Sequence, residues 1–193
     1  MPNIAAFVSY VLVTTFTPGP NNIMSMSNAS RYGFKKSIMF NAGIFVGFIF
    51  VIGLCSIFSV TLFNIIPTIK PVMTWIGAAY ILWLAWKTYK SKPPGENENG
   101  STNTFMSGLV LQFVNMKVIL YGITTVSTFV VPYYKSIFVL TGFSVLLAFI
   151  AFIATCCWSL FGSVFRKVLV KYNSAVNAVM SMLLLYCVVS LFL

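Results

Sequence analysis

The stretch TPGPNN, residues 17–22, lies within an apolar run that has no charged residue before Arg31. Its two prolines and its glycine disfavour a regular helix, because proline removes a backbone donor and glycine loses more entropy on ordering. Inside a membrane, such a break is tolerated only where protein or a water-filled cavity satisfies the freed backbone groups. The stretch therefore predicts a broken membrane helix whose backbone groups face a cavity. A loop between two shorter helices, or a simple kink, is the alternative.

The composition of the remaining chain is that of a membrane protein. Of its 193 residues, 59% are hydrophobic and 7% are charged, and the mean hydropathy is +0.94. A soluble domain has about 25% charged residues, so most of this surface must face lipid. A helix crosses the bilayer core in about 20 residues. The uncharged runs predict an all-α membrane protein with six transmembrane helices, at 4–30, 38–63, 71–89, 105–131, 136–161 and 173–193.

Basic residues lie in short clusters between the apolar runs, and the formal net charge is +10. This pattern fits the excess of Lys and Arg in cytoplasmic loops, so nucleic acid is not an expected partner. Nine basic residues fall in the first, third and fifth loops, and two in the second and fourth. The bias predicts a multi-pass membrane protein whose first, third and fifth loops are cytoplasmic and whose two termini lie outside. The nine are Arg31, Lys35, Lys36, Lys87, Lys90, Lys92, Arg166, Lys167 and Lys171, and the two are Lys70 and Lys135.

One hydrophilic stretch, SKPPGENENGSTN at residues 91–103, separates the third predicted span from the fourth. We expect a cytoplasmic linker, 91–104, that divides a single transporter domain into a first repeat, 1–90, and a second repeat, 105–193. Three spans are an odd number, so the second repeat inserts upside down relative to the first. Inverted repeats are a common plan of transporters, with the substrate site at their interface.

The fourth predicted span contains QFVNMK, residues 112–117, about midway along its length. Lys117 is the only charged residue away from the ends of a predicted span, and such residues are usually functional because they are costly in lipid. It is a candidate partner for a substrate carboxylate. The alternative is a lysine that reaches the membrane surface, with residues 105–116 re-entering the membrane rather than crossing it.

The predicted spans contain no Asp, Glu or His, since Glu96 and Glu98 lie in the linker. Hydrolytic acid–base chemistry and metal catalysis therefore lack their usual residues, so we expect no enzyme activity, no metal and no cofactor. Proton coupling has the same difficulty, and Lys117 is the only conventional candidate for a proton carrier. Either the protein is a uniporter, which requires no further assumption, or Lys117 carries the proton.

These motifs resemble the lysine-exporter superfamily and its homoserine/threonine-resistance branch. The resemblance rests on TPGPNN followed by a basic turn, GFKK at 33–36. Most of that branch has aspartate where this chain has Asn21, and NPK where this chain has Asn115-Met116-Lys117. Both departures, together with WIGAAYI at 75–81 and LQFVNMKVILYG at 111–122, are typical of one subfamily, the cysteine/O-acetylserine exporters. With asparagine at position 21, proton coupling inferred from the wider branch does not carry over.

The resemblance implies an inner-membrane exporter of small amino acids, cysteine and O-acetylserine foremost, that works by alternating access. The substrate would lie between the broken first and fourth helices. Export of another neutral amino acid such as homoserine or threonine, a small-solute channel, and a membrane scaffold without transport are the alternatives. The sequence leaves open whether the chain acts as a homo-oligomer. The expected substrate-binding residues are Pro18, Gly19, Pro20, Asn21, Asn22, Gln112, Asn115 and Lys117.

Overall fold

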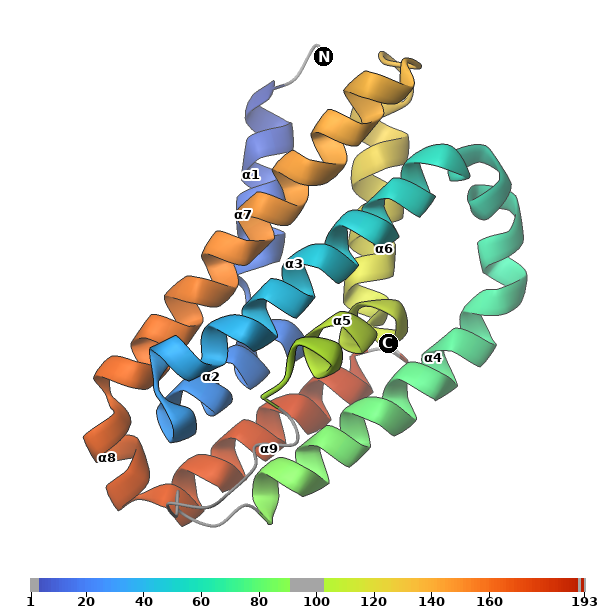
Figure 1. Cartoon of the computed structure of the whole chain (residues 1–193). Coiled ribbons are helices and arrows are strands. Elements are labelled where there is room, and N and C mark those ends of the chain that lie inside the picture. Colours follow the sequence, from blue (N-terminus) through green and yellow to red (C-terminus); the bar gives the residue numbers. More distant parts are fainter. Residues whose placement is uncertain (1–3, 91–102, 191, 193) are drawn as a thin grey trace.

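The computed structural model of the chain describes residues 4–90, 103–190 and 192, with the side chains of 59–70, 73 and 170 excepted. Within these residues every regular element is a helix (Figure 1), as the composition predicts. The expected linker, 91–104, lies outside the described residues except for its last two positions. Thr104 accepts a hydrogen bond from the Ser107 backbone and caps the helix that follows.

The first helix is broken where the sequence predicts it. Helix α1 (Ile4–Phe16) ends before the TPG residues, and α2 (Pro20–Tyr32) begins with proline at its first turn. Proline suits this position because its missing N–H would lack a helical partner anyway. Gly19 precedes it in an extended conformation, with a φ of −170°. The break is therefore local, and helical structure resumes after three residues.

The second predicted break is also present. Helix α5 (Phe105–Val114) and helix α6 (Met116–Thr125) are separated by Asn115, and α6 continues into a π-helical turn, η1 (Val126–Val130). The two helical segments are bent by 64° relative to each other. The bend at Asn115 fits either a broken span or a re-entrant segment.

Two described helices are each long and apolar enough to cross a membrane, α3 (Phe34–Ile57) and α7 (Ile137–Val164). The bent pair of α5 with α6 and η1 makes a third if it counts as one span. A short helix, α8 (Arg166–Lys171), connects α7 to α9 (Asn173–Val189), and α9 packs against α4 (Ser59–Tyr89).

The boundaries of the second and third predicted spans, 38–63 and 71–89, are wrong. Helix α3 ends at Ile57, and α4 is continuous from Ser59 to Tyr89, so the expected loop around Lys70 is helical. Figure 1 shows α4 as a curved helix. Pro67 and Pro71 each remove one backbone donor and bend a helix without necessarily ending it. The charge of Lys70, which separates the two uncharged runs, therefore did not mark the end of a helix.

Glycines allow α3 and α5 to approach each other closely. A Cβ atom on Gly43 of α3 would lie 1.9 Å from the Phe105 carbonyl oxygen, and one on Gly108 of α5 would lie 2.1 Å from that of Phe40. Toward the C-terminal end of α3, Gly53 has open space beside it. The packing of α3 is thus tight against α5, whereas Gly53 tolerates a larger side chain.

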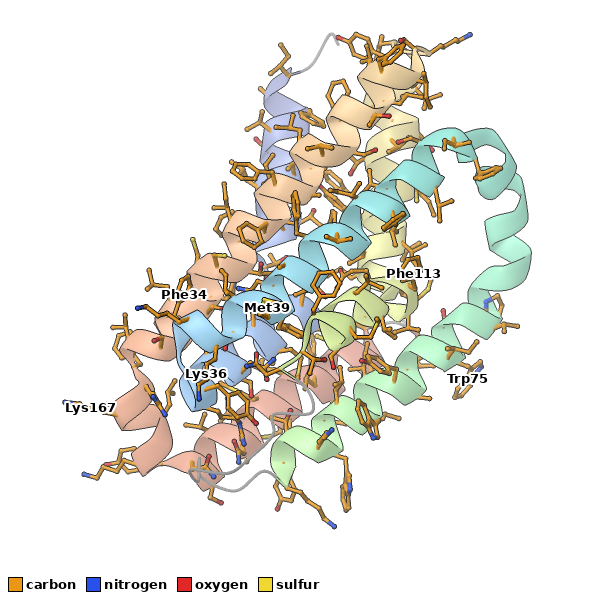
Figure 2. All side chains as sticks on the ribbon, in the orientation of Figure 1. Phe34, Lys36, Met39, Trp75, Phe113 and Lys167 are labelled. Carbon is orange, nitrogen blue, oxygen red and sulfur yellow. The ribbon has the colours of Figure 1, made fainter. Side chains whose placement is uncertain are left out.

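The outer surface is apolar along the helices and basic at one end. Figure 2 shows Trp75 pointing away from the bundle. Trp75 has 68% of its surface exposed, and Met39 of α3 has 54% exposed. Lys36 and Lys167 lie at the end that holds the α2–α3 turn and α8. Exposed aromatic and aliphatic side chains on this scale are costly in water and ordinary in lipid.

Candidate functional site

The two helix breaks meet, and a network of amide side chains joins them. The Asn21 side chain on α2 donates a hydrogen bond of 2.7 Å to Gln112 Oε1 on α5, and its Oδ1 accepts one of 3.2 Å from Gln112 Nε2. Asn115, between α5 and α6, donates to the same Asn21 oxygen at 3.0 Å. These bonds join residues more than 90 positions apart, so the fold places the two predicted motifs side by side.

The side chains of two asparagines hold the backbone at the breaks. Asn22 Nδ2 donates to the carbonyl oxygens of Thr15 and Thr17, at 2.8 and 2.9 Å. Asn115 Oδ1 accepts from the backbone N–H of Lys117 at 3.1 Å and so caps α6. An unsatisfied buried backbone group costs free energy, so both asparagines stabilise the broken geometry.

The ammonium group of Lys117 lies against the first break. Its Nζ donates to Thr17 Oγ1 at 2.9 Å, to the Thr17 carbonyl at 3.1 Å and to the Pro18 carbonyl at 3.3 Å. These oxygens follow the C-terminus of α1, where the helix dipole is negative. No acidic residue is among the described residues, since both acids of the chain are Glu96 and Glu98. Backbone and hydroxyl oxygens therefore hold this ammonium.

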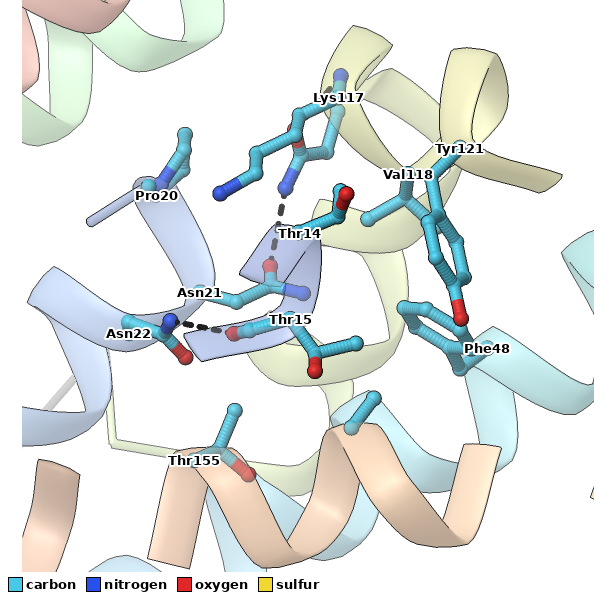
Figure 3. A pocket seen from close by; sticks show the side chains of 13 residues that line it. Thr14, Thr15, Pro20, Asn21, Asn22, Phe48, Lys117, Val118, Tyr121 and Thr155 are labelled. Atoms are coloured by element: carbon cyan, nitrogen blue, oxygen red, sulfur yellow. Dashed lines mark hydrogen bonds between the residues drawn. The ribbon is translucent and has the colours of Figure 1, made fainter. Parts of the chain in front are cut away.

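A small pocket lies beside the network (Figure 3). It encloses about 40 Å³, which is room for roughly three waters. Figure 3 shows Asn21 projecting into it from α2, with Phe48 and Tyr121 on the opposite side. The full lining is Thr14, Thr15, Gly19, Pro20, Asn21, Asn22, Phe48, Asn115, Lys117, Val118, Tyr121, Ala151 and Thr155.

A larger cavity of about 590 Å³ adjoins this pocket. It lies between α1, α4, α6 and α9, and its wall is mostly apolar. The shared residues Thr14, Pro20, Asn115, Lys117 and Tyr121 line both spaces. Because α1 and α6 lead away from the basic end (Figure 1), the combined space lies on the far side of the breaks from the basic clusters.

The structure brings all eight expected site residues together, but they do not all line the same cavity. Six of them line the small pocket, and Pro18 lines the larger cavity. Gln112 lines neither of these two spaces. Its side chain is fully buried and bonds to Asn21 and to the Gly108 carbonyl. Gln112 therefore positions Asn21 and does not face the cavity.

Sequence reasoning missed the contributions of α3 and α7. Phe48 of α3 and Thr155 of α7 complete the pocket wall, and the Thr155 hydroxyl donates to the Phe152 carbonyl of its own helix. A polar residue within an apolar span was the available signal for Thr155. Phe48 had none, because phenylalanine is common throughout this chain.

The chemistry of the site suits a small molecule that carries both charges. One wall offers an ammonium and amide N–H donors, and the backbone at the break offers carbonyl acceptors. The described residues include no group of three or more His, Cys, Asp or Glu side chains that could hold a metal. The cysteines among the lining residues of the larger cavity are limited to Cys187.

Comparison with known proteins agrees with these features. The profile of the LysE type translocator family matches residues 12–193. The chain is 43% identical over 189 residues to a protein of Salmonella choleraesuis (strain SC-B67) named cysteine/O-acetylserine efflux protein, covering 98% of this chain and 97% of that one. It is 41% identical, with the same coverage, to a protein of that name from Escherichia coli (strain K12). No solved structure matches the chain.

Proposed function

The chain belongs to the LysE type translocator family, and from this we propose that it exports a small zwitterionic amino acid, cysteine or O-acetylserine, across the bacterial inner membrane. The proteins of Salmonella and Escherichia coli that it resembles along nearly their whole length are named cysteine/O-acetylserine efflux protein. The observation that supports the assignment most directly is the meeting of two broken helices at one cavity, with Lys117 and Asn21 in its wall.

A substrate zwitterion would use both kinds of group at the site. Its carboxylate would meet the Lys117 ammonium and the amide of Asn115, which in this structure donates to Asn21. Its ammonium would meet the carbonyl oxygens of Thr17 and Pro18. The larger cavity gives its side chain an apolar wall, which suits the thiol of cysteine and the acetyl group of O-acetylserine.

Two inverted repeats of three spans each would give the carrier its two alternating faces. In this arrangement α1 with α2, α3 and α4 would correspond to α5 with α6, α7 and α9. The close glycine contacts between α3 and α5 would help to shut the basic end, while the two cavities of the site lie on the other side of the breaks. If the basic end faces the cytoplasm, as the charge bias predicts, the structure is the outward-facing state and both termini are periplasmic.

Transport in proteoliposomes tests the proposal. Vesicles loaded with unlabelled cysteine or O-acetylserine should take up the labelled compound by exchange, with saturation at high concentration. Homoserine and threonine as competitors measure the substrate range, and Lys135→Gln, in the exposed α6–α7 connection, is a control that should leave exchange unchanged. Flux that rises linearly with concentration would indicate a channel, and no flux of any amino acid would refute the proposal.

Energy coupling is measured in the same vesicles. Uniport is our proposal, since a tenfold outward gradient already supplies about 1.4 kcal/mol and the described residues hold no acid to carry a proton. A pH gradient imposed at equal substrate concentrations should then cause no lasting accumulation. Accumulation driven by pH alone would rule out uniport, and its loss in Lys117→Gln would make Lys117 the proton carrier.

A further inference from the structure

The position of the Lys117 ammonium bears on how the carrier returns without cargo. We propose, on the basis of the function proposed above, that Lys117 is a tethered substitute for the substrate's ammonium group. In the empty carrier its Nζ donates hydrogen bonds to the oxygens of the first helix break. In the loaded carrier the substrate ammonium takes that place, and Lys117 turns to the substrate carboxylate.

The oxygens of the break form a seat for one ammonium. Two carbonyls and one hydroxyl, from Thr17 and Pro18, lie 2.9–3.3 Å from Lys117 Nζ, and an ammonium has three N–H donors. The seat follows the end of α1, which has no basic residue in its last turn. The negative end of this helix dipole therefore has Lys117 as its nearest cation among the described contacts, and a cation there is favoured.

The seat is accessible to cargo. Lys117 lines both the small pocket and the larger cavity, and Thr17 and Pro18 line the larger cavity. An α-amino acid that enters this space can thus reach the seat and the lysine together. Its ammonium replaces one cation on the carbonyls by another, and its carboxylate provides the displaced lysine with a partner of opposite charge. Each charged group therefore keeps either a hydrogen-bond acceptor or a partner of opposite charge before and after the exchange.

The substitution matters because an alternating-access uniporter must also close while empty. Freed carbonyls and an unpaired lysine in a closed, water-poor site would each cost free energy. With Lys117 in the seat, the empty site carries the same cation–carbonyl contacts as the loaded one. The return of the empty carrier, which limits net efflux but not exchange, is therefore the step that Lys117 accelerates.

Gly19 provides the space for the lysine. A Cβ atom at this position would lie 3.0 Å from both Cδ and Nζ of Lys117. The backbone of Gly19 is extended, at φ −170° and ψ 172°, and alanine adopts that conformation without strain. Gly19→Ala thus pushes the lysine a few tenths of an ångström out of its position in the seat while keeping its charge, and it offers a second, independent perturbation.

The experiment compares two fluxes in proteoliposomes that contain the full chain. Net efflux of labelled O-acetylserine into substrate-free buffer requires the empty carrier to return, whereas exchange at saturating substrate on both sides does not. Lys117→Gln should lower exchange, because the carboxylate loses its partner. It should lower net efflux by at least about tenfold more, the effect expected from one lost charge-assisted hydrogen bond. Lys135→Gln should change neither flux.

Two further measurements separate the proposal from a purely structural role. Gly19→Ala should raise the ratio of exchange to net efflux in the same direction, and Gly53→Ala, whose new methyl meets no atom within 4 Å, should not. Propylammonium, added equally to both sides of Lys117→Ala vesicles, should fill the empty seat and restore part of the net efflux. If Lys117 only anchors the end of α1, these variants should not affect net efflux more than exchange, and propylammonium should not restore net efflux.

The outcomes distinguish this inference from the proposed function. If the wild type shows neither exchange nor net efflux, the exporter assignment fails and the inference fails with it. If the wild type transports and Lys117→Gln lowers both fluxes by the same factor, the assignment stands and the tethered-ammonium role is refuted. Unchanged net efflux in Lys117→Gln refutes it equally.

Discussion

The close approach of α3 and α5 can be tested by adding one methyl group at a time. Gly108→Ala would place a Cβ atom 2.1 Å from the Phe40 carbonyl oxygen and 3.0 Å from the Ile44 nitrogen, whereas ordinary contact begins at 3.4 Å. Both neighbours are backbone atoms of α3 and cannot rotate away. The two helices must therefore separate by more than about 1 Å, a gap that forfeits a quarter to a half of each dispersion contact.

The expected loss of stability follows from this separation. Overpacking of a well-packed core costs typically about 1–3 kcal/mol, and a backbone clash belongs at the upper end of that range. For a chain of this length such a loss corresponds to roughly 2–12 °C in the midpoint of thermal unfolding. Gly43→Ala should behave alike, since its Cβ atom would lie 1.9 Å from the Phe105 carbonyl oxygen.

Thermal unfolding of the purified protein in one detergent, followed by intrinsic tryptophan fluorescence, measures the effect. Gly53→Ala and Gly142→Ala are matched controls, because they are helical positions where a Cβ atom meets nothing within 4 Å. The controls should be neutral or gain about 0.5–1 kcal/mol, since alanine favours a helix over glycine. Equal midpoints for Gly108→Ala and Gly142→Ala would refute the inferred packing of α3 on α5.

Three further predictions concern the break, the topology and the amide network. Replacing Gly19 and Pro20 together by alanine should favour a continuous helix and abolish export, with membrane insertion retained. Export at the wild-type rate would show that the break has no role in transport. A cysteine at Asn97 in a cysteine-free background should resist an impermeant thiol reagent in intact cells, because we expect a cytoplasmic linker, and its labelling would reverse the topology. Gln112→Leu should destabilise the protein by about 1–3 kcal/mol, since it leaves buried amide groups unpaired. Phe113→Leu on the adjacent, partly exposed position should cost less, and equal midpoints would contradict the network.

The sequence predicted what depends on local backbone chemistry and on composition. Helical membrane segments follow from long apolar runs with few charges, because only hydrogen-bonded helices or barrels are tolerated in lipid. The first break follows from Pro18, Gly19 and Pro20, whose effect on a helix needs no tertiary partner. The basic clusters likewise marked one end of the molecule in advance. The number of spans and the inverted repeat remain predictions.

Local rules were insufficient where distant contacts decide the outcome. Lys70 separates two uncharged runs and suggested a loop, yet α4 continues through it, and the donors that Pro67 and Pro71 remove can be accommodated by bending. Gln112 was expected to face substrate, but the fold encloses it between Asn21 and the Gly108 carbonyl. Neither result is encoded in the residues adjacent to these positions.

The features of the candidate site also separate into those that the sequence determined and those that the tertiary structure decided. The sequence determined that TPGPNN would interrupt a helix and that Lys117 would be a costly charge in an apolar segment, because both properties belong to the residues themselves. Only the tertiary structure decided that Lys117 Nζ lies on the Thr17 and Pro18 oxygens, 100 and 99 positions away. That contact depends on how the α5–α6 bend and the α1–α2 break are placed against each other, and helix packing rather than residue type sets this placement.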